Sequence, residues 1–494
     1  AHRENSFVSR MTLARGRAKG EGQGNVLTWR FGGVMRKQND LGMIWQWLCG
    51  ADGAHALGKT AQERLPMTAS TLTHGLWGRS APAAPDTAPL EGDVQADVAV
   101  IGAGYTGLSA ALHLAQLGRS VVVLEARKIG FGGAGRNVGL VNAGMWVMPE
   151  DLLTALGSDM GARLLDFLGD APREVFDLID RYAIPCEAQR TGTLHCAVGP
   201  KGLAEVQDRC RQWQARGAAV EVLGKAEAAR KIGSDGYEGA LWDHRAGTIQ
   251  PMAYARGLAR AVLAEGAQIY TGTQVQNVQH VGDGWQLRTE GGTVRAGALI
   301  AAGDAYMGGV FPELATQQVI LPYFNMATTP LTPQQLSEIL PEKQGAWDTQ
   351  EVLTSFRLDA AGRLVWGSVG ALGVEASVHR AWALRDMARL FPQLRGVTFE
   401  HEWFGQIGMT TNNLPRLHVL GPNGFAVAGY NGRGIAPGTV CGKALAHHIA
   451  GNLPLDEIPL PQVAAHPAPM RDIKSAALRV GAALVHGVSA VRPR

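Results

Sequence analysis

The chain has 494 residues, a formal net charge of +3, five cysteines and 64 glycines. Charges of both signs nearly balance, which argues against a nucleic-acid partner, and the apolar runs are shorter than the ~20 residues of a membrane-spanning helix. The cysteines show neither a CxxC pair nor zinc-like spacing, so we expect a reduced, cytoplasmic protein without a metal site. Glycine makes up about 13% of the chain against a usual ~7%, which predicts many turns and ligand-contacting loops.

Residues 1–70 show no sustained apolar periodicity and mix glycine with scattered charge. We expect them to be a disordered extension that precedes the folded domains, with Met67 as a candidate natural start and the residues before it as upstream sequence translated by misassignment; a targeting presequence and a regulatory tail are the alternatives. No function is assigned to this segment.

The most informative segment is 97–107, in which the apolar run 98–101 leads directly into a glycine turn and a helix start. Gly102 permits the sharp turn off the strand, Gly104 leaves room for a pyrophosphate, and Gly107 lets the helix pack closely on the sheet. The free N–H groups at the helix start suit phosphate oxygens. The pattern predicts a dinucleotide-binding βαβ unit.

A carboxylate follows the second strand of this unit. Residues 120–124 form an apolar strand, and Glu125 ends it at the distance expected for contact with an adenosine ribose. A nicotinamide-linked dehydrogenase would carry the same features, so these residues alone leave the dinucleotide open.

A long glycine-rich loop, 126–144, comes next, and a nicotinamide enzyme has no need of it. Its Gly-Arg-Asn-x-Gly signature at 135–139 resembles the second FAD-contacting loop of the D-amino-acid oxidase and sarcosine oxidase superfamily. Ala134 stands where that superfamily usually has serine, which removes one hydroxyl contact but leaves the backbone donors. The resemblance covers the chain from about Trp77 onward.

A mostly helical region follows the loop. Apolar residues recur at helical spacing in 161–168 and 173–182, and a strand over 192–198 interrupts them. Residues 242–251 form the expected crossover back to the first unit. A hairpin with a glycine-rich turn is expected over 275–289.

Three later runs predict an antiparallel sheet. They cover 317–329, 353–370 and 399–411, and the middle run contains a hairpin turn at 358–363. We expect this sheet to form the floor of a substrate pocket, with a helix over 378–390 packed outside it.

Further segments also resemble the superfamily. Residues 298–303 are similar to the strand end that returns the chain to the FAD domain, and 425–443 are similar to its last strand, glycine turn and helix, which opens here near Pro437. In the superfamily this helix points its N-terminus at the flavin. The stretch 404–415 matches the segment that carries the flavin-linking cysteine of sarcosine-oxidase-like enzymes, and it has no cysteine, which implies non-covalent FAD.

Residues 470–486 place apolar side chains on one helical face and basic side chains on the other. We expect this helix to dock its apolar stripe onto the FAD-binding domain. The alternative is a peripheral contact with a membrane surface, which would suit a quinone-linked enzyme.

The resemblance implies an α/β (α+β two-domain) fold, in which a Rossmann-like FAD-binding domain is interleaved with an antiparallel-sheet substrate domain. The segments of the two domains alternate along the chain. The expected FAD-binding segments are 94–150, 240–305 and 415–455, the expected substrate-domain segments are 151–239 and 306–414, and 456–494 form a C-terminal helical tail.

The resemblance also implies which residues contact FAD. In the superfamily the second loop wraps the pyrophosphate and runs along the flavin ring, and the residue that matches Val275 contacts adenine through its backbone. The expected FAD contacts are Gly102, Gly104, Tyr105, Thr106, Gly107, Glu125, Ala126, Arg127, Gly133, Arg136, Asn137, Gly139, Leu140, Val275, Gly303, Gly429, Gly432, Arg433, Gly434 and Ile435.

The implied activity is FAD-dependent oxidation of the C–N bond of an amine or amino acid. A hydride passes from the carbon beside nitrogen to flavin N5, water hydrolyses the imine, and oxygen or a quinone accepts the electrons. Within the superfamily the chain is most similar to the γ-glutamylputrescine oxidoreductase type of bacterial amine-catabolic flavoenzymes, while D-amino acids and pipecolate-like cyclic amines stay open as substrates. The alternatives are an NAD(P)-linked Rossmann dehydrogenase, which would purify colourless, and a flavin-binding protein without catalysis, which amines would not bleach.

Substrate contacts are expected from the pocket floor. Tyr323 opens a strand that in relatives passes the flavin, although a core tyrosine would fit the same pattern. Arg363 or Arg357 would bind a carboxylate bidentately, although hairpin arginines are usually solvated. His244, beside the crossover, is a third candidate, and a surface histidine is the alternative.

Overall fold

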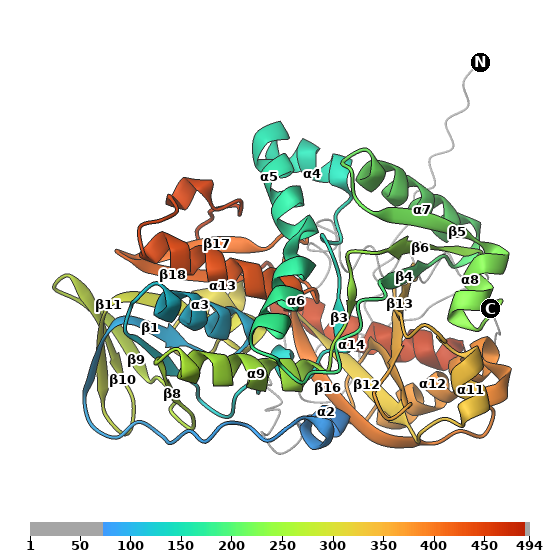
Figure 1. Cartoon of the computed structure of the whole chain (residues 1–494), viewed down its shortest axis with the longest axis horizontal. Coiled ribbons are helices and arrows are strands. Elements are labelled where there is room, and N and C mark those ends of the chain that lie inside the picture. The colour runs from blue at the N-terminus through green and yellow to red at the C-terminus, as the bar shows by residue number, and fades with distance from the viewer. Residues whose placement is uncertain (1–72, 490–494) are drawn as a thin grey trace, which may run out of the picture.

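The computed structural model describes residues 73–489 and is built on two eight-stranded sheets (Figure 1). The pairs of the first sheet are parallel between β1, β2, β8, β11 and β18, while β17 pairs antiparallel with β18. Its strand order is β17 (Arg416–Gly421), β18 (Gly424–Ala428), β11 (Thr293–Ala301), β1 (Val94–Ile101), β2 (Val121–Leu124) and β8 (Gln268–Tyr270), and the hairpin β9 (Asn277–Val281) and β10 (Gly284–Arg288) joins at β11. The predicted hairpin over 275–289 is confirmed.

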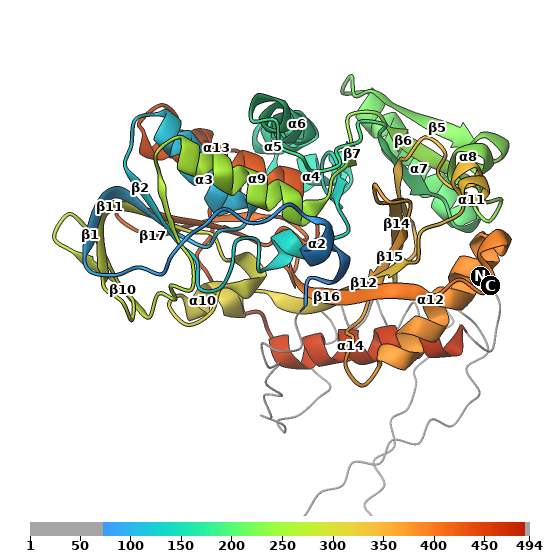
Figure 2. The same ribbon diagram turned by 60° about the horizontal axis from the view of Figure 1, so that its bottom comes forward.

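Three helices, α3 (Tyr105–Gln116), α9 (Pro251–Ala264) and α13 (Ile435–Ile449), cover one face of this sheet (Figure 2). Every residue of β2 is buried, which explains its continuous apolar run, because parallel strands are covered on both faces. A Cβ on Gly442 of α13 would overlap the carbonyl oxygen of Thr106, so the glycine is needed for the close contact of α13 with α3.

The second sheet contains all the strands predicted for the pocket floor. Its order is β16 (Phe399–Met409), β12 (Val319–Thr328), β15 (Leu364–Val369), β14 (Thr354–Leu358), β13 (Gly345–Asp348), β4 (Thr193–Cys196), β6 (Gly239–Asp243) and β5 (Val220–Gly224). The three predicted runs pair antiparallel with one another, as expected, and the sheet continues through β13 and β4, which pair in parallel. These two strands come from separate segments of the chain rather than from a hairpin, so no tight turn imposes an antiparallel pairing.

Helices and short strands complete the two halves of the molecule. The helices predicted over 161–168 and 173–182 are confirmed as α5 and α6, and the one over 378–390 as α12. The bounds are α2 (Gly75–Ser80), α4 (Pro149–Leu156), α5 (Ser158–Gly169), α6 (Ala171–Arg181), α7 (Gly199–Gln214), α8 (Lys225–Ile232), α10 (Pro312–Thr316), α11 (Pro333–Glu338), α12 (Ala376–Leu390), α14 (Arg471–Val488), β3 (Leu140–Val141) and β7 (Gly247–Thr248).

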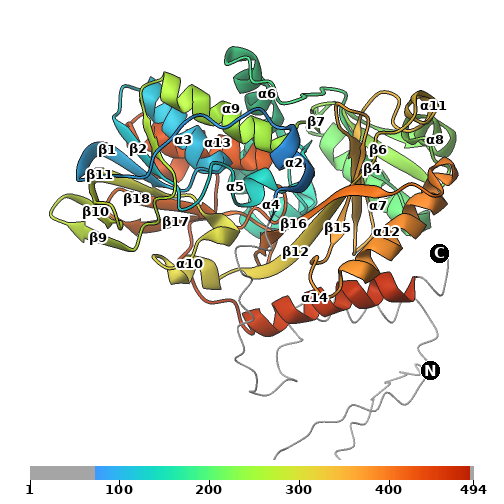
Figure 3. The same cartoon turned by 90° about the horizontal axis from the view of Figure 1, so that it is seen from below.

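The C-terminal helix α14 lies along β12 and α12 of the second sheet's half, not on the FAD-binding half as expected (Figure 3). Its buried side chains, Leu478, Ala482 and His486, face inward, and the His486 ring stacks on Trp382 with 3.8 Å between ring centroids. These buried side chains of α14 pack on the face of β12 beside α12. Sequence periodicity predicts that the helix has an apolar face, but it does not specify which sheet that face packs on.

Within residues 73–489 no helix is long and apolar enough to cross a membrane. The arrangement confirms the expected α/β class with two interleaved halves. The domain limits stay a prediction, and the limit set at residue 240 falls inside β6, which pairs within the second sheet. The segment 1–70 lies outside the described residues.

Candidate active site

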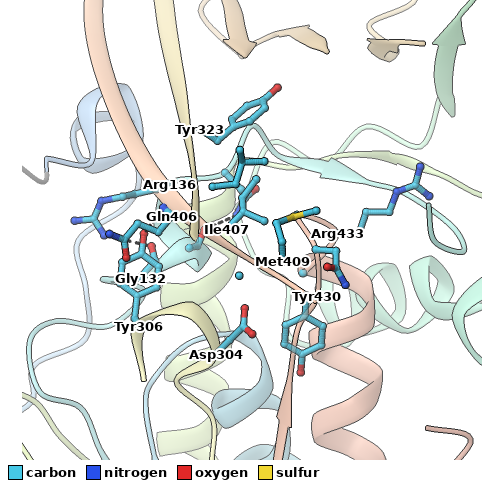
Figure 4. Close-up of a pocket in the computed structure, with 18 of the residues that line it drawn as sticks. Gly132, Arg136, Asp304, Tyr306, Tyr323, Gln406, Ile407, Met409, Tyr430 and Arg433 are labelled. Carbon is cyan, nitrogen blue, oxygen red and sulfur yellow. Dashed lines mark hydrogen bonds between the residues drawn. The ribbon is translucent and has the colours of Figure 1, made fainter. Parts of the chain in front are cut away.

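A cavity of about 890 Å³ lies between the two sheets (Figure 4). One part is lined by the strand ends and glycine turns of the first sheet, and the other by β12, β13 and β16 of the second. The figure shows Asp304 and Tyr306 at one end, Tyr323 at the other, and Arg136 and Arg433 on opposite sides. This volume is near the upper end of the roughly 300–1,000 Å³ of ligand sites, as a large ligand requires.

The glycines of the first glycine turn have two different roles: two are required by the backbone, and one leaves space for a ligand. Gly102 has a φ of +103°, which favours glycine, and a Cβ on Gly107 would overlap the Gly102 carbonyl oxygen. Gly104 differs, because a Cβ there would meet only the Cβ of Ala134 at 3.9 Å, and its backbone is extended. Gly104 therefore keeps the cavity open at the N-terminus of α3, where free N–H groups can bind phosphate.

Glu125 connects the first glycine turn, 102–107, with the loop 126–144. We call these two segments, together with the last glycine turn at 429–434, the FAD cradle. Its carboxylate accepts hydrogen bonds from the backbone N–H groups of Ala103 (2.8 Å) and Arg127 (2.9 Å). Burial raises the pKa of this carboxyl group above its usual value. The side chain also lines the cavity, so its expected ribose contact stays a proposal that the geometry permits.

Asn137 organises the second loop from within. Its amide nitrogen donates to the carbonyl oxygens of Gly133 (2.9 Å) and Ala134 (3.1 Å) and to the Tyr105 hydroxyl (3.2 Å). Its amide oxygen accepts from the N–H of Gly139 at 2.9 Å. One side chain thus fixes the loop's backbone conformation, which gives the asparagine of the signature a physical reason.

Arg136, the neighbouring signature residue, is almost fully buried beside the loop. Its guanidinium lies 4.4 Å from the ring centroid of Phe131, and its carbonyl oxygen accepts from the Asn325 amide (2.9 Å) and the Trp403 indole N–H (3.1 Å). Trp77 of α2 donates to the Asn137 carbonyl oxygen at 2.9 Å. These contacts join the loop to β12 and β16, the floor of the other half.

The last glycine turn is held from two sides. The Asp304 carboxylate accepts from the N–H of Gly429 at 2.7 Å, and the hydroxyls of Tyr430 and Thr106 lie 2.7 Å apart. Burial raises the pKa of Asp304 to about 6. The N-terminus of α13, which begins at Ile435, consequently borders the same cavity as the N-terminus of α3.

The structure brings most of the predicted FAD contacts to this cavity. Gly107, Gly139 and Gly429 do not line it, and they act as close-packing or turn positions instead. The predicted residues that line it are Gly102, Gly104, Tyr105, Thr106, Glu125, Ala126, Arg127, Gly133, Arg136, Asn137, Leu140, Val275, Gly303, Gly432, Arg433, Gly434 and Ile435.

Of the residues predicted to contact the substrate, some line the cavity and others do not. Tyr323 lines the cavity, its hydroxyl lies 2.6 Å from the Ser355 hydroxyl, and burial raises its pKa. His244 is exposed and lies 2.9 Å from Glu221, and Arg363 bonds to Glu400 and Asp359 at the hairpin turn. Neither lines the cavity, and each lies beside a carboxylate elsewhere in the structure.

Arg357 is buried rather than solvated, yet it also lies outside the cavity lining. Its guanidinium donates to the Ile249 carbonyl oxygen and lies 3.8 Å from the Glu187 carboxylate. Burial lowers its pKa to about 10. The side chain joins the crossover to β14 and is not oriented toward a ligand.

Sequence reasoning missed several residues that line the cavity. Asp304 directly follows the identified Gly303, so its position was readable from the motif. The others lie on elements whose facing depends on sheet pairing and helix packing, and no local signal marks them. They are Trp146, His195, Arg209, Tyr306, Trp347, Gln406 and Met409.

Comparison with known proteins identifies the family. The family described as "DAO: FAD dependent oxidoreductase" matches residues 97–448. The chain belongs to this family. Gamma-glutamylputrescine oxidoreductase from Escherichia coli (strain K12) is 34% identical over 374 residues, which cover 74% of this chain and 85% of that protein. Glycine oxidase from Geobacillus kaustophilus is 23% identical over 366 residues, which cover 71% of this chain and 92% of that protein.

Solved structures agree on the fold. The crystal structure of glycine oxidase from Geobacillus kaustophilus has a TM-score of 0.61 at 21% identity, and the match covers 76% of this chain and 100% of that one. L-Amino acid deaminase from Proteus myxofaciens has a TM-score of 0.63 at 15% identity over 76% of this chain and 94% of that one. The family match and the relative from Escherichia coli, rather than these structures, make the protein an FAD-dependent oxidoreductase, and the NAD(P)-linked alternative is not favoured.

The cradle also fits FAD on its own geometry. A pyrophosphate fits the free space beside Gly104 and the N-termini of α3 and α13. A ribose fits the buried Glu125 carboxylate. Among the described residues that line the cavity, none is a cysteine. We expect the cofactor to be held without a covalent bond to cysteine.

Proposed function

We propose that this flavoenzyme oxidises the C–N bond of a small amine. The observation that carries the proposal is one cavity, which joins the FAD cradle to a chamber with Tyr323, Trp146 and Trp347 in its walls. Such a chamber can hold an extended amine beside the cofactor and exclude water from it. The name of the relative from Escherichia coli supports a γ-glutamylated amine as the substrate.

FAD, when bound, accepts the hydride that the carbon beside the amine nitrogen gives up. The protein's residues have the simpler task of positioning that carbon. Leu321, Val369 and Leu353 form apolar walls next to Tyr323, whose ring is fixed by its hydrogen bond to Ser355. We propose that the Tyr323 ring and hydroxyl orient the amine within this chamber.

Oxygen or a quinone is proposed as the electron acceptor. Lys474 and Leu478 of α14 line the cavity, and the outer face of the same helix exposes Ile473, Val480 and Leu484. An apolar face beside the cavity supports a peripheral contact with a lipid surface, from which a quinone would reach the flavin. Sedimentation with anionic vesicles and comparison of reoxidation by air and by a soluble quinone test this part.

Anaerobic bleaching of the purified yellow protein tests the proposed reaction. γ-Glutamylputrescine should bleach the flavin, and putrescine, glycine and sarcosine should do so more slowly. Failure of every amine and amino acid to bleach a flavin-replete protein would refute amine oxidation. It would favour the alternative of a flavin-binding protein without catalysis.

A further inference from the structure

Helix α2 lies outside the residues that match the family, yet it packs beside the FAD cradle. The family match begins at residue 97, and α2 covers Gly75–Ser80. The helix lies next to α9 of the first half and β16 of the second (Figure 1). None of residues 73–80 lines the cavity, so any effect of this segment on a bound cofactor must pass through neighbouring residues.

Three contacts join residues 73–77 to the loop 126–144, and each reaches a loop residue that lines the cavity. They are the hydrogen bond from Arg136 Nε to the Thr73 carbonyl oxygen (3.0 Å), that from the Trp77 indole N–H to the Asn137 carbonyl oxygen (2.9 Å), and the contact of His74 Nε2 with the Phe131 carbonyl oxygen (3.1 Å). The His74 ring donates in this contact, because a carbonyl oxygen only accepts. Burial, followed by the charge of Arg136, lowers the pKa of His74 to about 4, so near pH 7 its ring is neutral and does not repel that arginine.

Trp77 connects the loop to both halves of the molecule. Its side chain is fully buried, and its ring meets the ring of Trp403 on β16 edge to face, with 5.4 Å between the centroids. The Trp77 carbonyl oxygen accepts from the Gln250 amide at 3.1 Å, which joins α2 to the N-terminus of α9. One residue thus contacts the loop, α9 and β16.

Gly75 allows α2 to approach β16 closely. Its φ is +48°, which favours glycine, and a Cβ on this residue would overlap the Trp403 ring. A side chain at position 75 would therefore push α2 away from β16 and move Trp77 away from the loop.

The loop itself is costly to order. It carries six glycines, and glycine loses more conformational freedom on ordering than any other residue. If FAD had to order the loop on binding, this cost would weaken its affinity, whereas contacts that hold the loop beforehand remove the cost. The hydrogen bonds of the Asn137 side chain fix the shape of the loop, but they do not fix its place between the two halves.

We propose that residues 73–80 form a clasp that holds the loop 126–144 in place for FAD, with Trp77 as its positioning residue. The clasp extends the cofactor site to a segment upstream of the family match. It concerns FAD binding alone and does not rest on the proposed amine oxidation.

Trp77→Phe tests the clasp through a single hydrogen bond. Phenylalanine keeps an aromatic ring beside Trp403 but cannot donate to Asn137, so FAD affinity should fall about 2- to 10-fold. The dissociation constant comes from the fluorescence of FAD released when the holoenzyme is diluted. Circular dichroism of the bound flavin should also change, because it reports how the surrounding residues hold the ring.

Trp285→Phe is the matched control. Trp285 is also buried, and its indole N–H donates to the Pro422 carbonyl oxygen at 2.9 Å, but the residue does not line the cavity or contact the clasp. This variant should lose thermal stability to a similar extent and keep the FAD affinity and flavin dichroism of the wild type.

A second pair of variants displaces the whole clasp. Gly75 and Gly92 both have a positive φ, so alanine is strained at either position, but a Cβ on Gly92 meets nothing within 4 Å. FAD affinity should fall at least about fivefold in Gly75→Ala, from overpacking against Trp403, and should stay at the wild-type value in Gly92→Ala. The thermal midpoint at saturating FAD is measured for every variant, and if Gly75→Ala does not fold, the Trp77→Phe comparison decides.

An equal loss of FAD affinity in Trp77→Phe and Trp285→Phe would overturn the clasp, because a general loss of stability would then explain both. Wild-type FAD affinity and flavin dichroism in Trp77→Phe would also overturn it and leave α2 as a packing element. Neither outcome depends on whether any amine bleaches the flavin, so the clasp and the proposed amine oxidation fail separately.

Discussion

Replacement of Gly104 by valine should weaken FAD binding without unfolding the protein. Gly104 precedes α3 in extended backbone, with φ −92° and ψ −172°, which valine also adopts. A Cβ there contacts only the Cβ of Ala134 at 3.9 Å, so the branched side chain would occupy the cavity rather than clash with the fold.

The expected loss of FAD affinity follows from the loss of space at the proposed pyrophosphate site. Extra carbon atoms in a well-filled site cost about 1–3 kcal/mol. Because about 1.36 kcal/mol corresponds to a factor of ten, FAD affinity should fall roughly 5- to 150-fold in Gly104→Val. The thermal midpoint of the apoprotein should stay unchanged, since no buried atom of the protein is displaced.

Gly224→Val is the matched control. Gly224 also precedes a helix in extended backbone, with φ −65° and ψ 164°, and a Cβ there meets nothing within 4 Å. FAD dissociation constants come from fluorescence titration of both apoproteins with FAD. Wild-type FAD affinity in Gly104→Val would refute the placement of the pyrophosphate at this turn.

Three further outcomes are expected. Tyr323→Phe should lower the free energy of unfolding by about 0.5–1.5 kcal/mol in urea denaturation, because the Ser355 hydroxyl loses its 2.6 Å partner, and should slow flavin reduction if the hydroxyl orients the amine. Protonation of Asp304 below about pH 6 removes the negative charge that holds the Gly429 N–H, so FAD release should accelerate on acidification in the wild type and not in Asp304→Asn. Burial lowers the pKa of His379 from 6.5 to about 4, so on acidification the unfolded chain binds a proton at this residue before the folded protein does. The free energy of unfolding should therefore fall as pH drops from about 6.5 to about 4, and in His379→Gln it should fall less steeply. Equal slopes of the free energy of unfolding against pH in the two proteins would contradict this sign.

The cofactor cradle was predictable from the sequence because its residues are constrained by contacts along the chain. Gly102 needs its positive φ, and Gly107 needs to approach the Gly102 carbonyl oxygen, so both follow from the local motif. Asn137 bonds to residues two to four positions away, which is why the second loop carries a recognisable signature.

The substrate end was not predictable in the same way. Arg433 lies in a recognised motif, but its side chain is directed by Trp146 and Trp347, which come from distant segments. Arg363 and His244 have suitable chemistry, yet each is paired with a surface carboxylate that periodicity does not reveal. Similarly, the parallel pairing of β13 with β4 and the docking of α14 on β12 depend on tertiary packing.

The most direct test of the account is a single anaerobic turnover of the holoenzyme with γ-glutamylputrescine, in which flavin absorbance and the C–N oxidation products are measured together. The account predicts that bleaching of the flavin is matched by equimolar aldehyde and ammonia after hydrolysis. Flavin reduction without these products, or no reduction by this or any other amine or amino acid, would contradict it.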